Sequence, residues 1–250
     1  MTAPDLTWQT LQATAERARQ GAQHEQAIDL YTRALTQLDL PWEAYTAMTL
    51  ARTESRRMLG QLSEVDTELS TLADRAAAKK DDAVQSMALA ELSFALRQSG
   101  DLDRGMRLAQ EALEAAGRAG QPGLKADALW IIGVLQAEKG QYQTARESLA
   151  EAQSLISPED PLRQVKAFYL QSLIRIRSGQ FEGEAFFIDA HKGLEIARAI
   201  GNRDIEGYLL NGIAIATSDR TQIQSLFEQA LKAFEGAGDL PGQATIINNE

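Results

Sequence analysis

Histidine is the side chain that most often does acid–base or metal chemistry at neutral pH, and this sequence contains two, His24 and His191. The run from His24 to Ile28 begins like the zinc-binding helix of a metalloprotease, but Ile28 stands where the second histidine ligand would be. Cysteine is absent, so no thiolate ligand or thiol nucleophile can complete such a site. His191 lies in an Ala/Leu-rich stretch with no assignable catalytic partner. We therefore predict no metal site and no catalytic histidine.

Carboxylates and glycine-rich segments are also able to do chemistry or to bind ligands. Asp101 and Asp103 have the spacing of the first two ligands of a calcium loop, but the later Gly and Glu of that loop are missing. The adjacent acids Asp81 and Asp82 are predicted to cap a helix N-terminus. The glycine-rich segment 236–242 follows no strand and misses the spacing of phosphate-binding loops. The sequence thus predicts a protein that is not an enzyme and has no cofactor.

Composition and charge limit which kinds of partner and which cellular compartment the sequence predicts. Hydrophobic residues make up 44% of the 250 residues and charged residues 24%, which is typical of a folded protein. The chain has 35 acidic and 25 basic residues, so its net charge of −10 predicts no nucleic-acid partner. The longest apolar stretch, around 129–135, is too short to span a membrane. With no targeting segment at its start, the chain is predicted to be cytoplasmic and to have no membrane partner.

Glycine-containing steps recur along the chain at intervals of 39 or 40 residues. They are Gly21-Ala22, Leu59-Gly60-Gln61-Leu62, Ser99-Gly100-Asp101-Leu102, Lys139-Gly140-Gln141-Tyr142 and Ser178-Gly179-Gln180-Phe181. A second set, Gly120, Gly201 and Gly238, lies half a period out of phase, with Lys80 where the same phase predicts a glycine. Such a fixed period indicates a repeat architecture of segment, break, segment, break.

The segments between the breaks have the composition and spacing of helices. They are rich in Ala, Leu, Glu, Gln and Arg, and apolar residues recur with helical periodicity. Period-two alternation is missing, so strands are not expected. The sequence predicts one superhelical domain over 1–250, with six helix pairs at about 6–38, 41–79, 81–119, 122–156, 160–200 and 202–237, and a truncated helix at 240–250. Because one helix pair cannot bury its apolar faces alone, successive pairs should stack.

The fourth unit resembles a tetratricopeptide repeat. The slots of that motif are filled, in order, by Leu129, Ile132, Gly133, Gly140, Tyr142, Ala145, Leu149 and Ala152. The other units keep parts of the pattern, and the second is degenerate, with Thr53 and Val65 at a Gly and an Ala slot. The resemblance implies an all-α, right-handed α-solenoid of about six helix-turn-helix repeats plus a partial final helix. The period near 40 is similar to that of repeats in bacterial regulatory and signalling proteins.

The same resemblance implies that the first helix of each pair lines a concave groove. Aromatic residues and arginines recur on that side, and these are frequent binding hot spots. The candidate groove residues are Arg57, Phe94, Arg97, Trp130, Tyr169, Leu173 and Arg177. The hypothesis is a groove for an extended or helical peptide, with an acidic or C-terminal group held by arginine. The alternative is that the aromatic residues fill the core between repeats and the arginines form surface ion pairs.

Two functions follow from this resemblance. The first is a protein–protein or protein–peptide interaction module, acting as a scaffold or as the input domain of a bacterial regulatory protein. The second is a sensor of a signal peptide or small ligand that passes a change in superhelix shape to an output domain. Because the final helix is short, we expect the chain to be a fragment of a longer protein. Neither the partner nor the oligomeric state follows from the sequence.

Overall fold

The computed structural model describes residues 7–181 and 183–249. These residues form thirteen α-helices and no strand. The helices are α1 (Trp8–Gln20), α2 (His24–Leu35), α3 (Trp42–Met58), α4 (Leu62–Lys79), α5 (Asp82–Ser99), α6 (Leu102–Ala119), α7 (Pro122–Glu138), α8 (Tyr142–Leu155), α9 (Pro161–Arg177), α10 (Glu184–Ala199), α11 (Arg203–Ala216), α12 (Arg220–Ala237) and α13 (Leu240–Ile247). The architecture is a right-handed α-solenoid of six helix pairs plus a short last helix, which confirms the predicted fold class.

The ends of the helices follow the local sequence closely. The observed pairs begin and end within one residue of the predicted ones, except for the first pair, which was expected over 6–38 and spans Trp8 to Leu35. The expected starting point Leu6 and the final residue Glu250 lie outside the described residues. None of the described helices is long and apolar enough to cross a membrane.

Capping residues explain why the helices begin and end where they do. The Asp81 carboxylate accepts a hydrogen bond from the backbone N–H of Val84, and Asp101 does the same for Arg104. Both acids therefore act as N-caps, as was predicted for Asp81. At the C-terminal end of α4, Lys80 adopts a left-handed conformation with φ 57°, where the period predicts a glycine. At the first break, Gly21-Ala22, the residue with the left-handed conformation is Ala22, with φ 56°.

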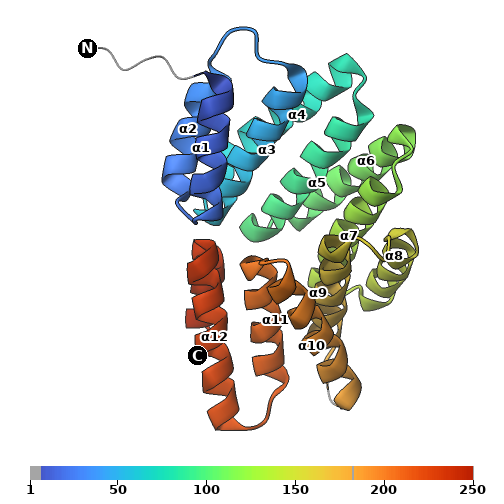
Figure 1. Cartoon of the computed structure of the whole chain (residues 1–250). Helices are drawn as coiled ribbons and strands as arrows, with labels where there is room; N and C mark the ends of the chain where they lie inside the picture. The colour runs from blue at the N-terminus through green and yellow to red at the C-terminus, as the bar shows by residue number, and fades with distance from the viewer. Residues whose placement is uncertain (1–6, 182, 250) are drawn as a thin grey trace.

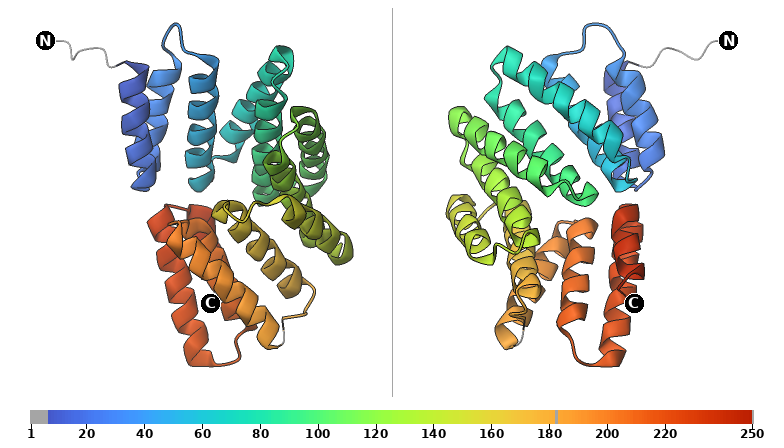
Figure 2. Two further views of the ribbon diagram at one scale, coloured as in Figure 1. Left: turned by 45° about the vertical axis from the view of Figure 1, so that its right-hand side comes forward. Right: turned by 180° about the vertical axis from the view of Figure 1, so that it is seen from behind.

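The helices wind around a central space so that the first two repeats and the last repeat approach each other. In each pair the two helices pack together, and the first helices α5, α7, α9 and α11 also pack on one another. Alanines fill the contact face of α6, where Ala109, Ala112, Ala115 and Ala116 are fully buried. Figure 1 and Figure 2 show that the superhelical path brings the end of α12 directly below α1 and α2. The inner surface therefore encloses a space on most sides.

Small residues allow the closest helix contacts, and one of them provides a test of the packing. A Cβ atom on Gly193 of α10 would lie 2.7 Å from the Cβ atom of Phe168 on α9, and neither atom can move without its backbone. We expect Gly193→Ala to lower the free energy of unfolding by about 1–3 kcal/mol, as overpacking does. Gly117 of α6 meets nothing closer than 3.8 Å, so Gly117→Ala should instead raise it by about 0.5–1 kcal/mol. Urea unfolding of both variants measures the difference; equal effects would contradict this packing.

Candidate functional site

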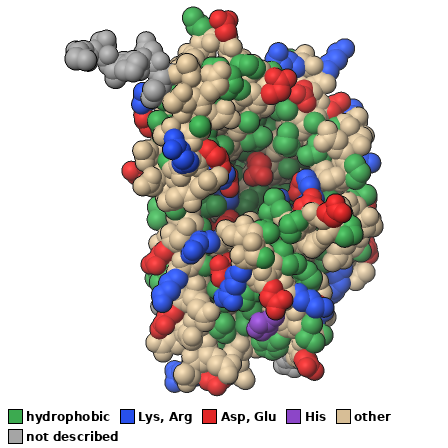
Figure 3. Space-filling view, viewed as in Figure 1, with side chains coloured by type: hydrophobic (Ala, Val, Ile, Leu, Met, Phe, Trp, Pro, Cys, Tyr) green, Lys and Arg blue, Asp and Glu red, His purple; other side chains and the backbone are tan. Residues whose placement is uncertain are grey.

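The inner surface of the superhelix encloses a cavity of about 1060 Å³. Its walls come from α1, α3, α5, α7, α9 and α11, from the start of α2, from the turn before α11 and from the C-terminal end of α12. Figure 3 shows the cavity as a hollow in the middle of the face, with hydrophobic and acidic side chains at its bottom. The site is thus built from side chains that lie far apart in the sequence and that successive repeats bring to one place.

A continuous ladder of aromatic rings runs across the inner helices α5, α7, α9 and α11 and ends on α12. The ring centroids of Phe94 and Trp130 are 5.2 Å apart, and those of Trp130 and Tyr169 are 6.1 Å apart. Tyr208 lies 5.5 Å beyond Tyr169, and Phe234 lies 4.9 Å beyond Tyr208. The first three side chains are each less than one tenth exposed, although all three line the cavity. Each ring therefore serves both as cavity wall and as packing between repeats.

Most charged side chains on the cavity wall are already paired. Arg19 contacts Glu54 on α3 at 2.6 Å, and it also contacts Glu16 within its own helix. Lys166 Nζ lies 3.1 Å from the Asp127 carboxylate and 5.1 Å from the centre of the Trp130 ring. Arg163 contacts Asp127 and Asp160. These cations already form ion pairs with carboxylates of the protein, so they do not offer an unpaired positive charge to a ligand.

Two charged groups on the wall differ from the rest, Glu91 on α5 and Arg203 on α11. Among the described residues, neither side chain has a hydrogen bond or ion pair. Glu91 is solvent-exposed on the cavity wall, and the surrounding protein nevertheless raises the pKa of its carboxyl group by removing part of its water. The nearby acids Glu54 and Asp127 raise this pKa further, while Lys166 and Arg57 lower it. The cavity thus offers one carboxylate and one guanidinium that have no direct hydrogen-bond or ion-pair partner among the described residues.

The residues predicted to form the groove are divided by the structure into two groups. Arg57, Phe94, Trp130 and Tyr169 lie on the cavity wall. Arg97, Leu173 and Arg177 do not line it.

The two arginines that lie off the wall share one acidic partner, Glu138. Arg97 Nη1 lies 3.3 Å from Glu138 Oε1, and Arg177 Nη2 lies 2.8 Å from Glu138 Oε2. The guanidinium groups of Arg57 and Arg97 also cover the Phe94 ring, at 5.2 and 4.9 Å from its centre. The arginines proposed to hold a ligand carboxylate are therefore occupied within the protein.

Sequence reasoning missed Glu91, Arg203, Tyr208 and His24 as residues of the site. A signal existed for Glu91, because it precedes Phe94 by three residues, as Asp127 precedes Trp130 and Lys166 precedes Tyr169. No such signal exists for His24, which is buried and whose role depends on a residue at the other end of the chain. His191 is exposed on α10, with Nδ1 2.7 Å from the carbonyl oxygen of Phe187.

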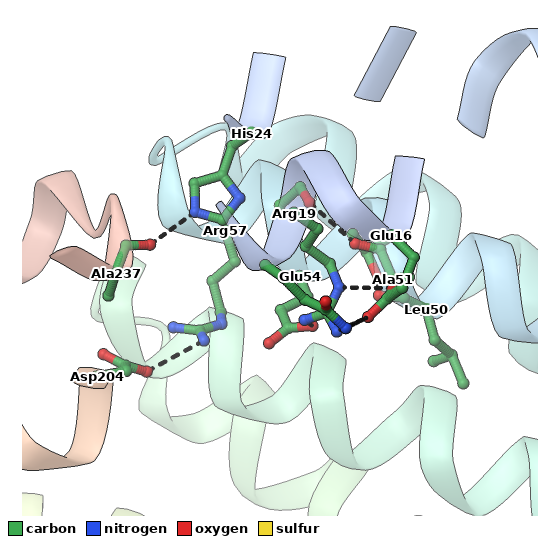
Figure 4. A network of polar contacts seen from close by, with 12 residues as sticks. Glu16, Arg19, His24, Leu50, Ala51, Glu54, Arg57, Asp204 and Ala237 are labelled. Atoms are coloured by element: carbon green, nitrogen blue, oxygen red, sulfur yellow. Dashed lines mark hydrogen bonds and ion pairs between the residues drawn. The ribbon is translucent and has the colours of Figure 1, made fainter. Parts of the chain in front are cut away.

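The first two repeats and the last repeat meet at one edge of the cavity. His24 Nε2 lies 2.7 Å from the carbonyl oxygen of Ala237, so this nitrogen carries the proton and donates it (Figure 4). Arg57 Nη2 lies 3.4 Å from Asp204 Oδ2, again between the two ends of the chain. All four residues also line the cavity. These contacts close the superhelix into a ring.

Comparison with known proteins places the fold. No family model matches the chain, and no curated protein matches it in sequence. A Rap protein complexed with Competence and Sporulation Factor has a similar structure, with a TM-score of 0.71 and 14% identity over 97% of this chain and 73% of that one. The Rap conjugation gene regulator of plasmid pLS20, in complex with a Phr peptide, gives a TM-score of 0.74 and 14% identity over 96% and 72%. The chain therefore has the tetratricopeptide-like helical-repeat fold that is also found in Rap proteins.

Proposed function

We propose that this chain is a peptide-binding regulatory scaffold, and that its ligand is a short peptide with free termini held in the central cavity. The observation that carries the proposal is the pair of unpartnered, opposite charges, Glu91 and Arg203, on the wall of an enclosed, aromatic-lined cavity. The two structural neighbours were both solved with a bound peptide or factor, which supports a peptide as the class of ligand.

The size of the cavity limits what can enter it. Small-molecule sites are typically about 300–1,000 Å³, and this cavity of about 1060 Å³ is slightly larger than that range. A volume of this size can hold a few extended residues but not a folded domain. The size therefore favours a short peptide over a globular partner.

The charges on the wall indicate how such a peptide would be oriented. A cationic group of the peptide, such as its terminal amine, would compensate Glu91 and favour the ionised form of that carboxylate. The planar guanidinium of Arg203 can hold a carboxylate with two parallel hydrogen bonds. An acidic or C-terminal group would thus bind arginine, as the sequence suggested, but at Arg203 and not at the arginines predicted for this role.

Apolar contacts would supply much of the affinity. Leu162 is 45% exposed and Ile200 is 37% exposed, and both lie on the cavity wall beside the aromatic ladder. Large apolar side chains that are exposed in a concave site are suited to burying a ligand side chain. The expected ligand therefore combines at least one apolar side chain with its two terminal charges.

Pools of synthetic hexapeptides test the proposal directly. One pool has free termini, a second is N-acetylated and a third is C-amidated, and native mass spectrometry compares their binding to the full chain. We expect the free pool to bind and each blocked pool to bind more weakly. If the blocked pools bind as well as the free pool, or if no pool binds, the proposal is wrong.

Substitution of the two unpartnered charges separates binding from folding. Glu91→Gln and Arg203→Gln should each weaken binding of the free peptides about 10- to 100-fold, as the loss of a charged hydrogen bond of about 1.5–3 kcal/mol implies. Glu91→Gln should leave the melting temperature equal or higher, because burial already disfavours the ionised carboxylate. The exposed residues Glu195 and Arg220, changed to Gln, are the matched controls. Equal affinity in variant and control would contradict the assignment.

The role of each charge can also be matched to one end of the peptide. N-acetylation should have no further effect on binding to the Glu91→Gln variant, and C-amidation should have no further effect on binding to Arg203→Gln. If acetylation still weakens binding to Glu91→Gln by the same factor, the amine is held elsewhere.

A further inference from the structure

Three elements of the last two repeats meet at one end of the cavity. Leu162 is the second residue of α9, Ile200 follows the end of α10, and Arg203 begins α11. Because α9 and α10 form an antiparallel pair, the start of α9 lies beside the end of α10, and α11 begins after a short turn at the same end. All three residues line the cavity. The fold therefore brings two apolar side chains and one cation to the same part of the wall.

The two apolar side chains differ from the rest of the wall in their exposure. Leu162 and Ile200 are exposed, whereas other large aliphatic side chains that line the cavity, such as Leu124 and Ile205, are buried within the protein. Exposed apolar surface in contact with water is removed from it when a ligand side chain covers it, which favours binding. Leu162 and Ile200 therefore form the part of the wall that is available to an aliphatic side chain of a ligand.

Arg203 carries an unneutralised positive charge because the acids next to it in α11 have other partners. Asp204 Oδ2 lies 3.4 Å from Arg57 Nη2 on α3. Glu206 Oε1 lies 2.7 Å from Arg198 Nε at the end of α10. Among the described residues the Arg203 guanidinium is thus left without an ion pair, and it can donate two parallel hydrogen bonds to a carboxylate of a ligand.

Gly236 of α12 fixes where this guanidinium lies. A Cβ atom on Gly236 would be 2.6 Å from Arg203 Nη1 and 2.9 Å from Arg203 Cδ, so the arginine fills the space that a side chain at position 236 would occupy. Gly236 lies in the last turn of α12 and does not have the positive φ that favours glycine. The backbone therefore does not require glycine here, whereas the contact with Arg203 does. Both residues line the cavity, so Gly236 holds the positive charge on its wall.

We propose that Leu162, Ile200 and Arg203 form a subsite for the C-terminal residue of the bound peptide, and that Gly236 is the positioning residue for the arginine. This assignment rests on the proposed function and adds which residue of the peptide is apolar. A C-terminal residue carries its carboxylate and its side chain on the same Cα atom, so both groups reach one part of the wall together. The subsite therefore selects a peptide that ends in a free carboxylate and a large aliphatic residue, such as leucine, isoleucine or methionine.

Peptides that differ only at their last residue test the subsite. Four pools of hexapeptides with a free N-terminus and random preceding residues end in leucine, serine, leucine amide or glutamate amide, and native mass spectrometry compares their binding to the full chain. We expect the leucine pool to bind about 10-fold more tightly than the serine pool, because serine leaves the apolar surface of Leu162 and Ile200 uncovered. Both amidated pools should bind about 10- to 100-fold more weakly than the leucine pool, because they lack the C-terminal carboxylate.

The outcomes separate this subsite from the proposed function. If the leucine and serine pools bind equally well, the subsite is wrong while the peptide-binding cavity stands. If the glutamate amide pool binds as well as the leucine pool, the carboxylate comes from a side chain and the subsite is again wrong. If no pool binds, both the subsite and the proposed function are wrong.

Substitution of the aliphatic side chains shows whether they make this selection. Leu162→Ser and Ile200→Ser should each reduce the preference for leucine over serine about 3-fold and leave the effect of amidation unchanged. Both side chains are exposed, so the melting temperature should change little. Ile188→Ser on α10 is the matched control, because Ile188 is exposed but does not line the cavity. A preference that is the same in the variants as in this control overturns the subsite.

Gly236→Ala tests the positioning of Arg203. The atoms it would displace belong to an exposed, flexible side chain, and alanine favours a helix, so the melting temperature should be equal or higher. C-amidation of the leucine pool should then weaken binding by no more than about 3-fold, whereas N-acetylation should weaken it as in the wild type. A merely structural effect would change both factors, and Gly117→Ala, whose Cβ atom meets nothing closer than 3.8 Å, should change neither. A full effect of amidation in Gly236→Ala would overturn the role of Gly236.

Discussion

Replacing Trp130 with alanine is expected to lower the free energy of unfolding by about 3–5 kcal/mol, which is the range for removing a large buried aromatic side chain. Trp130 is 7% exposed and lies between Phe94 and Tyr169 in the aromatic ladder. Its indole Nε1–H also donates a hydrogen bond of 2.8 Å to the carbonyl oxygen of Lys166 on the next inner helix. Three repeats therefore lose contacts at once. Urea unfolding followed by circular dichroism measures the change.

Trp130→Phe is the matched control for this experiment. It keeps a ring between Phe94 and Tyr169 but removes the hydrogen bond to Lys166, so we expect a smaller loss than with alanine. Peptide affinity should be compared at a temperature at which all variants are folded. A drop in stability with unchanged affinity would remove Trp130 from the binding site, and a loss of stability below about 1 kcal/mol would contradict its role in the core.

Glu138 is the second residue whose removal should have a large effect. Its side chain is 15% exposed and pairs with Arg97, which is 12% exposed, and with Arg177, which is 52% exposed. Glu138→Ala leaves Arg97 buried without a counterion, so we expect a loss of about 3 kcal/mol in the free energy of unfolding. Arg177→Ala breaks an exposed pair and should cost less than about 1 kcal/mol. Thermal and urea unfolding of both variants check this order.

A double variant shows whether the cost comes from the uncompensated charge. Arg97→Met removes the buried cation but keeps an apolar side chain against Phe94, so Glu138→Ala in that background should be much less harmful than alone. If the two changes are additive, the buried ion pair does not explain the effect. If Arg177→Ala proves as destabilising as Glu138→Ala, the pair of Glu138 with Arg97 is not the source of the effect.

The repeat architecture could be predicted because its determinants are local. The glycine at each break adopts the left-handed conformation that ends a helix, as at Gly100 and Gly120, and aspartates such as Asp81 cap the following helix. These signals act over a few residues, so their period is visible along the chain. At two breaks the left-handed conformation is adopted by residues other than glycine, Lys80 and Ala22.

The functional site could be predicted only in part. Repeat register placed Arg57, Phe94, Trp130 and Tyr169 on the inner surface, because equivalent positions of successive helices face the same way. Register does not reveal which charges are neutralised. Arg97 and Arg177 share Glu138, whereas Glu91 and Arg203 have no partner among the described residues, and these facts depend on which side chains meet across repeats.

The sequence by itself determined the helices, their pairing and the repeat period, since each depends on residues that are close along the chain. The tertiary structure alone decided that the solenoid closes on itself. The contact between His24 and Ala237 joins residues 213 positions apart, and it forms only because small rotations between six helix pairs add up to bring the ends together. A sum of this kind depends on side-chain packing at every interface, and no local pattern of residues encodes it.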